Sequence, residues 1–241
     1  MDRKVAIHQP NYLPWPGYFY KLWLCDKFVF LDHVKLNKQG ITRRTYVPKS
    51  SEPSVKSYLT IPLLKHSDYT PIKDLKIDHS KDWARQHLHI IYQLYHKTPF
   101  VSELWPQLVN WYGDSGAFDS LVDWNVFLIN NIMTDLGINR ETHLSSTMNI
   151  KGVKDEMHTE IINKLGGNIY ISGASGTEYR KDSVFKAHSI KVIDIDFMSY
   201  MKDKPYKSSK YIPGLNILDI LFNIGKEGLI SYFEQYSLII K

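Results

Sequence analysis

Apolar residues form short continuous runs that alternate along the chain with longer stretches of helical spacing. The short runs predict buried strands at 5–7, 28–31, 58–62, 168–171 and 191–196. Apolar positions three and four residues apart predict helices at 18–26, 83–95, 118–136, 153–165 and 216–236. Strands alternating with helices are typical of an α/β protein with a mostly parallel sheet. We therefore predict a single α/β domain over residues 1–241, with a helical subdomain at about 83–165 and a C-terminal helical segment.

Two polar or irregular segments interrupt this pattern. Residues 8–17 contain three prolines and a glycine directly after the first strand, and this composition excludes regular secondary structure there. Residues 37–53 are basic and polar and include Lys38, Arg43, Arg44 and Lys49. We expect an exposed basic loop between strands in this second segment.

Composition fits a soluble globular protein, with 43% hydrophobic and 23% charged residues. The single cysteine, Cys25, excludes an internal disulfide and a cysteine-rich zinc site, and its apolar neighbours predict a buried thiol. The opening apolar run is too short for a signal peptide, and later runs fall short of the ~20 residues of a membrane span. We expect a cytoplasmic protein. The net charge of +5 favours anionic ligands, although nucleic acid is disfavoured because aromatic residues do not interleave the basic loop regularly.

The first candidate site combines His8 and Gln9, after the first strand, with Asp32, after the second. Ligands of open parallel sheets bind outside the carboxyl ends of the strands, so these residues are predicted to face one pocket. A carboxylate that fixes the imidazole tautomer makes histidine an effective general base. The alternative is that His8 and Asp32 only bond to loop amides at the strand ends.

The second candidate is the turn formed by Ser172, Gly173, Ala174, Ser175 and Gly176, which follows a predicted strand. Glycines allow successive backbone N–H groups to converge on an anion, and the hydroxyl groups add donors. This turn is a candidate phosphate site. Tight turns between strands use the same residue types, so a purely structural role stays open.

Basic and histidine residues elsewhere give weaker signals. Arg44 has the planar guanidinium that can bind a phosphate or carboxylate through two hydrogen bonds, but charges in loops are commonly only solvated. His87 and His89 are two positions apart on a predicted helix and point to different faces. A metal site is therefore disfavoured, and none is predicted.

Several longer motifs resemble those of the WbqC-like family of bacterial proteins. The segment 7–19 resembles the family's amino-terminal signature, and 28–32 resembles the strand and aspartate that follow it. Later blocks are similar in the same order, at 58–62, 95–100, 170–179 and 215–225. The family often has Asn-Arg where this chain has Arg43 and Arg44, so only Arg44 carries over.

This resemblance implies an enzyme of surface polysaccharide biosynthesis, such as O-antigen synthesis, or of unusual sugar biosynthesis. It points to transfer of an acyl or aminoacyl group to the amine of a nucleotide-linked amino sugar. The donor would be a nucleotide or an acyl group on pantetheine, carried by coenzyme A or by a carrier protein. His8, Asp32 and Gln9 would be catalytic. Substrate-binding residues would be Tyr12, Trp15, Arg44, Lys97, Ser172, Gly173, Ser175, Gly176 and Tyr179.

Two other functions remain open from the sequence. The first is a non-catalytic protein that binds nucleotide sugars or serves as a scaffold for other enzymes of the same pathway. The second is an enzyme that transfers nucleotidyl groups. A histidine after the first strand fits nucleotidyl transfer, but the usual second histidine at the start of the helix is replaced by Gly17, Tyr18 and Phe19.

Overall fold

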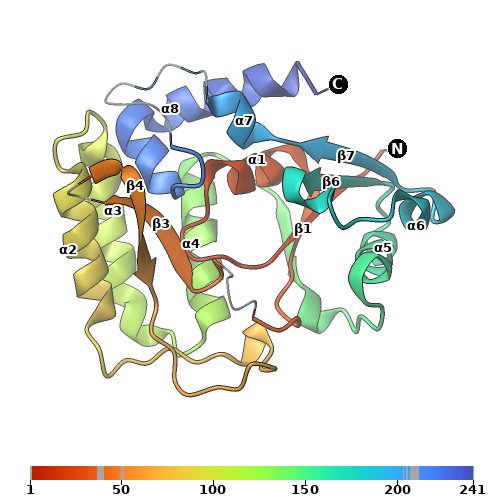
Figure 1. The fold of residues 1–241 in the computed structure, drawn as a ribbon, viewed down its shortest axis with the longest axis horizontal. Helices are drawn as coiled ribbons and strands as arrows, with labels where there is room; N and C mark the ends of the chain where they lie inside the picture. Colours follow the sequence, from red (N-terminus) through yellow and green to blue (C-terminus); the bar gives the residue numbers. More distant parts are fainter. Residues whose placement is uncertain are drawn as a thin grey trace.

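The computed structural model describes residues 2–36, 41–49, 52–202, 204, 206 and 212–240. Five parallel strands form its main sheet in the order β5-β2-β1-β6-β7. Their bounds are β1 (Lys4–His8), β2 (Lys27–Phe30), β5 (Glu141–Leu144), β6 (Ile169–Gly173) and β7 (Lys191–Ile195). The predicted α/β class with a mostly parallel sheet is confirmed (Figure 1).

The strand order places a topological switch between β1 and β6. From β1 the chain builds outward through β2 to β5, then returns to the other side of β1 and builds outward through β6 to β7. Connections on either side of such a point leave the sheet in opposite directions, which opens a crevice at the carboxyl ends of the two central strands. The crevice therefore lies beside His8 at the end of β1 and Gly173 at the end of β6.

Helices cover both faces of the sheet. On one face, α5 (Lys154–Lys164) and α6 (Asp182–Ala187) pack over alternate strand residues such as Val5 and Ile7. The other face, which includes Ala6, lies under α1 (Pro16–Leu24), α7 (Phe197–Met201) and α8 (Ile217–Ser237). Strand residues on both faces are buried, which explains the continuous apolar runs in the sequence.

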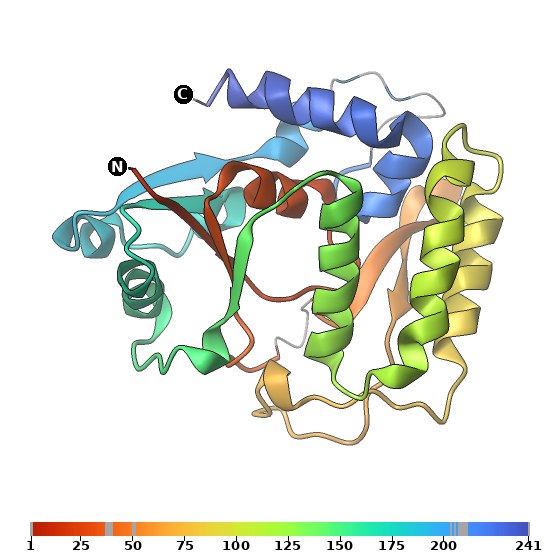
Figure 2. The same cartoon turned by 180° about the vertical axis from the view of Figure 1, so that it is seen from behind.

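The connection from β2 to β5 holds most of the remaining elements. An antiparallel hairpin, β3 (Arg44–Lys49) with β4 (Glu52–Thr60), is followed by three helices, α2 (Trp83–Tyr95), α3 (Val101–Gly113) and α4 (Leu121–Asp135). In Figures 1 and 2 these elements lie on one side of the molecule, and β6, β7, α5 and α6 lie on the other. The predicted helical segment at 83–165 thus includes β5, which belongs to the main sheet, and α5, which packs on it.

A kink divides the last helix. Gly225 in α8 has φ +74°, a conformation that strains other residues, and a Cβ atom there would lie 2.8 Å from the Phe100 ring. The predicted C-terminal helical segment is therefore two helical pieces joined at this glycine. Asn216 caps the first piece by accepting hydrogen bonds from the N–H groups of Leu218 and Asp219.

Candidate functional site

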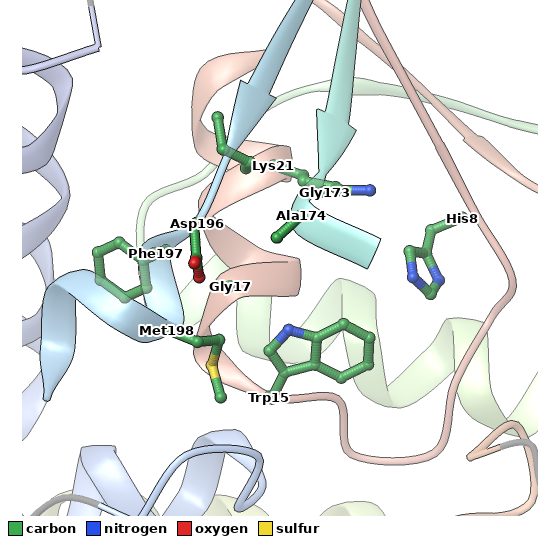
Figure 3. Close-up of a pocket in the computed structure, with 10 residues that line it drawn as sticks. His8, Trp15, Gly17, Lys21, Gly173, Ala174, Asp196, Phe197 and Met198 are labelled. Atoms are coloured by element: carbon green, nitrogen blue, oxygen red, sulfur yellow. The ribbon is translucent and has the colours of Figure 1, made fainter. Parts of the chain in front are cut away.

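A cavity of about 240 Å³ opens at the switch point, and we call it the β1–β6 cavity. Figure 3 shows its lining, which comes from the ends of β1, β6 and β7 and from the first turns of α1 and α7. The lining residues are His8, Trp15, Gly17, Lys21, Gly173, Ala174, Ile195, Asp196, Phe197 and Met198. The predicted site residues His8, Trp15 and Gly173 thus share one cavity.

The amino terminus of α1 forms one wall of this cavity. Trp15 is the residue that precedes the helix, and its side chain makes no capping hydrogen bond. Pro16 begins the helix, and the first turn contains no acidic residue. The helix dipole therefore gives this wall a partial positive charge that no acidic residue of the first turn neutralises, although Pro16 has no N–H and the Tyr18 N–H is bonded to Trp15 O.

Lys21 supplies a full positive charge to the same cavity. Its residue is 7% exposed, yet no hydrogen bond or ion pair to its ammonium is found among the described residues. A Cβ atom built on Gly173 would lie 3.4 Å from Lys21 Nζ, which places the ammonium at the end of β6. Burial lowers the pKa of Lys21 to about 8, and Cys25 and Asp194 oppose this shift. An unpaired, buried cation of this kind favours an anionic ligand.

His8 lies across the cavity with a neutral imidazole. Burial and then the charge of Lys21 lower its pKa to about 3. Its Nδ1 lies 3.2 Å from Gln9 O and 3.5 Å from Asn11 Nδ2. A carbonyl oxygen only accepts, so the shorter contact requires a proton on Nδ1 and leaves the lone pair on Nε2. The ring packs against Trp15 and Tyr18, with centroids 5.3 and 4.9 Å away.

Asp196 adds one carboxylate to the cavity lining. It precedes α7, and its Oδ1 accepts a hydrogen bond of 3.0 Å from Ser199 N. In Figure 3 it lies on the opposite side of the cavity from His8. The site therefore offers partners for a negative group, near Lys21 and α1, and for an amine, near Asp196.

The structure does not pair His8 with Asp32. The 1% exposed Asp32 accepts hydrogen bonds from Ser145 Oγ (2.9 Å), Ser146 N (2.8 Å) and Ser146 Oγ (2.6 Å), all at the end of β5. Strands β1 and β2 are neighbours as predicted, but the switch point lies on the other side of β1. The expected orientation of the imidazole by Asp32 is replaced by the contact with Gln9 O.

Gln9 and Tyr12 also lie outside the β1–β6 cavity lining. Gln9 Oε1 accepts a hydrogen bond of 2.9 Å from Thr42 Oγ1. Tyr12, 1% exposed, bonds through its hydroxyl to His87 Nδ1 at 2.8 Å and to the Tyr112 hydroxyl. The Tyr12 contacts tie the proline-rich segment to α2 and α3, and the Gln9 contact ties it to Thr42. Tyr12 and Gln9 therefore both support the loop that carries Trp15.

Two predicted cationic site residues lie elsewhere. Arg44 begins β3, with its guanidinium carbon 5.4 Å from the centre of the Tyr58 ring. Lys97 follows α2 in an exposed position. Neither lines the β1–β6 cavity. Lys38, from the same predicted basic loop, lies outside the described residues.

The predicted glycine-rich turn separates the β1–β6 cavity from a second one. Gly173 and Ala174 line the first, whereas Ser172 and Gly176 line a cavity of about 420 Å³, which we call the β6–α5 cavity. Its other lining residues are Lys154, Asp155, His158, Tyr170, Tyr179 and Arg180. A Cβ atom at Gly176 would lie 2.6 Å from Ser172 Oγ, so the turn requires glycine there. The side chain of Ser175 lies outside the described residues.

No helix in the described part of the chain is long and apolar enough to cross a membrane. The same residues contain no group of three or more His, Cys, Asp or Glu side chains placed to hold a metal ion. Cys25 is buried, as predicted, and burial raises its pKa to about 12, which keeps the thiol protonated.

Comparison with known proteins identifies the family. The model of the WbqC-like protein family matches residues 9–230, which include every lining residue of the β1–β6 cavity except His8. The chain belongs to the WbqC-like family. It is also 29% identical over 226 residues to the uncharacterized protein Rv1507c of Mycobacterium tuberculosis, a match that covers 93% of this chain and 95% of that protein. No solved structure matches the chain.

Lys21 and Asp196 are the charged residues of the β1–β6 cavity that were not predicted from the sequence. A signal for Lys21 is present, because it is the single charged residue in the nine-residue apolar segment that forms α1. Charged residues on a buried helix are uncommon unless they have a partner or a function. Asp196 gives no comparable signal, since capping the following helix accounts for an aspartate at that position.

Proposed function

We propose that this protein transfers an acyl or aminoacyl group to the amine of an amino sugar that carries a phosphate or nucleotide. The observation that supports the proposal best is the buried ammonium of Lys21, which forms no hydrogen bond or ion pair with the described residues and lines the same cavity as the amino terminus of α1. Membership of the WbqC-like family supports the proposal, because the sequence resemblance implies a role in polysaccharide or unusual sugar biosynthesis.

The anionic part of the substrate binds between Lys21 and the first turn of α1. Phosphate oxygens accept hydrogen bonds from the lysine ammonium and neutralise it, and the dipole of α1 stabilises their negative charge. The cavity of about 240 Å³ is smaller than most ligand sites, at about 300–1,000 Å³, and so holds only part of a nucleotide-linked substrate. Asp196 accepts a hydrogen bond from the sugar amine.

His8 acts as the base for the attacking amine. The amine nitrogen forms the new bond to the acyl carbonyl carbon, the donor's bond to its thiol or phosphate breaks, and Nε2 takes the amine proton and passes it to the leaving group. In the empty protein, burial and Lys21 keep His8 a weak base. A bound anion offsets the charge of Lys21, raises the pKa of His8 and so strengthens the base when substrate is present.

Activity assays with candidate substrates test this proposal. The protein is incubated with nucleotide-linked amino sugars and acyl donors, and the product is identified by the added acyl mass. We expect His8→Gln to lower kcat by about 10²–10⁴-fold with little change in the melting temperature. Lys65→Gln, an exposed change outside both cavities, serves as the control. Full turnover in His8→Gln with the true substrates would contradict the role of His8.

Nucleotidyl transfer is a second candidate because of the observed strand order. A histidine at the end of the central strand, beside a switch point and a helix amino terminus, is also placed to hold the phosphates of a nucleoside triphosphate. The two reactions differ in their products, because nucleotidyl transfer releases pyrophosphate. Release of pyrophosphate with no acylated product in the assay above would favour this second function.

A further inference from the structure

The β6–α5 cavity lies on the opposite side of the glycine-rich turn from the β1–β6 cavity. It is lined by α5, by Tyr170 and Ser172 of β6, and by the segment that runs from Gly176 to Arg180. Its volume of about 420 Å³ falls within the usual range of ligand sites, about 300–1,000 Å³.

The buried cation of this cavity, Arg180, is already neutralised, whereas the other cation in the lining, Lys154, is exposed. Arg180 donates from Nε to Asp182 Oδ1 at 2.7 Å, and from Nη1 and Nη2 to the two carboxylate oxygens of Asp194 at 2.6 and 2.8 Å. A further bond of 2.9 Å joins Nη1 to Ser172 Oγ. These bonds occupy the guanidinium, so it holds the turn in place and has little capacity left for a phosphate.

Apart from Lys154 and Asp155 in the first turn of α5, the rest of the lining consists of aromatic and neutral polar groups. Tyr179 is 83% exposed, which is unusual for so large a ring at the mouth of a cavity. Inside, the imidazole of His158 lies 5.6 Å from the centre of the Tyr170 ring. No hydrogen bond to either His158 nitrogen is found among the described residues, and burial lowers the pKa of His158 to about 4, so the ring is neutral.

We propose that the β6–α5 cavity binds the nucleobase of a nucleotide-linked substrate, through stacking on Tyr179 and hydrogen bonds to His158. A nucleobase has a flat face for the tyrosine and, on its edge, the donors and acceptors that a neutral imidazole can pair. An acyl chain would use neither feature. This inference deepens the proposed function, because the phosphates would then cross the exposed Ala174 and reach Lys21 in the β1–β6 cavity.

Direct binding measurements with simple probes test the assignment. Calorimetry compares inorganic pyrophosphate, uridine, UDP, GDP and dTDP on the wild-type protein and on Tyr179→Ala. We expect at least one nucleoside diphosphate to bind more tightly than pyrophosphate. Tyr179→Ala should weaken that binding by about 5- to 150-fold, the range for loss of one base–aromatic stack, and leave pyrophosphate binding unchanged.

Two variants serve as controls. Tyr179→Phe keeps the aromatic face and should retain the nucleotide affinity. Tyr69→Ala removes a tyrosine that is 81% exposed and far from Tyr179 in the sequence. This variant should leave the affinity for every probe unchanged. Melting temperatures within experimental error of the wild type exclude a general loss of folding in these exposed variants.

The outcomes separate this assignment from the proposed function. If pyrophosphate binds through Lys21 but no nucleoside diphosphate binds better, the nucleobase assignment is wrong and the anion site stands. If a nucleoside binds in a Tyr179-dependent way and pyrophosphate does not bind, the nucleobase site stands and the anion site fails. Tyr179-dependent binding of an acyl-pantetheine thioester, with none of the nucleotides, would contradict the nucleobase assignment in favour of the donor.

Discussion

The two cavities beside β6 share a wall. They differ in whether the buried cation of each one has hydrogen-bonded partners in the protein. In the β6–α5 cavity, Arg180 is held by Asp182, Asp194 and Ser172. In the β1–β6 cavity, Lys21 of α1 is buried and has no such partners among the described residues. The comparison teaches that a count of positive residues does not locate an anion site. The informative group is the cation that the protein leaves unpaired, because its desolvation is offset only when a ligand binds.

The largest effect is expected from Lys21→Met. Removing a buried, unpaired charge should raise the free energy of unfolding by on the order of 1–4 kcal/mol, as when buried ionic groups are replaced by packed apolar ones. Pyrophosphate affinity should fall at least about tenfold, because a hydrogen bond to a charged group contributes about 1.5–3 kcal/mol. Urea unfolding and calorimetry measure the two effects. Loss of stability together with unchanged affinity would show that Lys21 has only a structural role.

A smaller effect is expected from Asp194→Asn. Its carboxylate accepts two hydrogen bonds from Arg180, but its side chain is 38% exposed, so we expect the free energy of unfolding to fall by only about 1 kcal/mol. The matched change Asp182→Asn, at a side chain that is 62% exposed, should cost less than about 0.5 kcal/mol. Urea unfolding of both variants measures the difference. Equal effects would mean that Asp194 does not dominate the neutralisation of Arg180.

A further effect concerns acid stability, since each cavity contains a neutral histidine. Burial lowers the pKa of His8 to about 3 and that of His158 to about 4. Between these values and the ordinary histidine pKa of about 6.5, the unfolded chain binds more protons than the folded one. The free energy of unfolding should therefore fall as the pH drops from about 6.5 to 4.

The variant His8→Gln should show a shallower fall over this pH range. Asp219 has the opposite sign: burial raises its pKa to about 6, so its protonation stabilises the fold as the pH drops through that value. Asp219→Asn should then make the fall steeper. Urea unfolding at pH 4.5, 5.5 and 6.5 measures both slopes. Identical slopes in His8→Gln and the wild type would contradict a neutral, buried His8.

Local patterns in the sequence predicted the fold class and much of its order. The helix predicted at 83–95 is α2, and the strands predicted at 5–7 and 28–31 are β1 and β2 with one residue of difference at most ends. These elements are long or strongly apolar, so periodicity alone identifies them. The strand β5 was missed because it has only four residues, and β3 was missed because it lies in a basic, polar segment and contains Pro48, a residue type that is depleted in strands.

The candidate site was only partly predictable for a topological reason. A strand end marks His8, Trp15 follows it, and Gly173 ends β6, so position along the chain was enough to single these residues out. Whether β1 forms the cavity with β2 or with β6 depends on the strand order, which no local pattern encodes. The misplaced partner, Asp32, follows from that unknown, whereas Lys21 left a local signal as the single charged residue of α1.

The most direct test of the anion site is the titration of Lys21 itself. Nuclear magnetic resonance of Nζ-labelled protein follows the ammonium with and without pyrophosphate, and Lys21→Met identifies its signal. We predict a pKa of about 8 in the free protein that rises when pyrophosphate binds, because the anion stabilises the charged form. A Lys21 pKa at its ordinary value, unchanged by pyrophosphate, would contradict an anion site between β1 and β6.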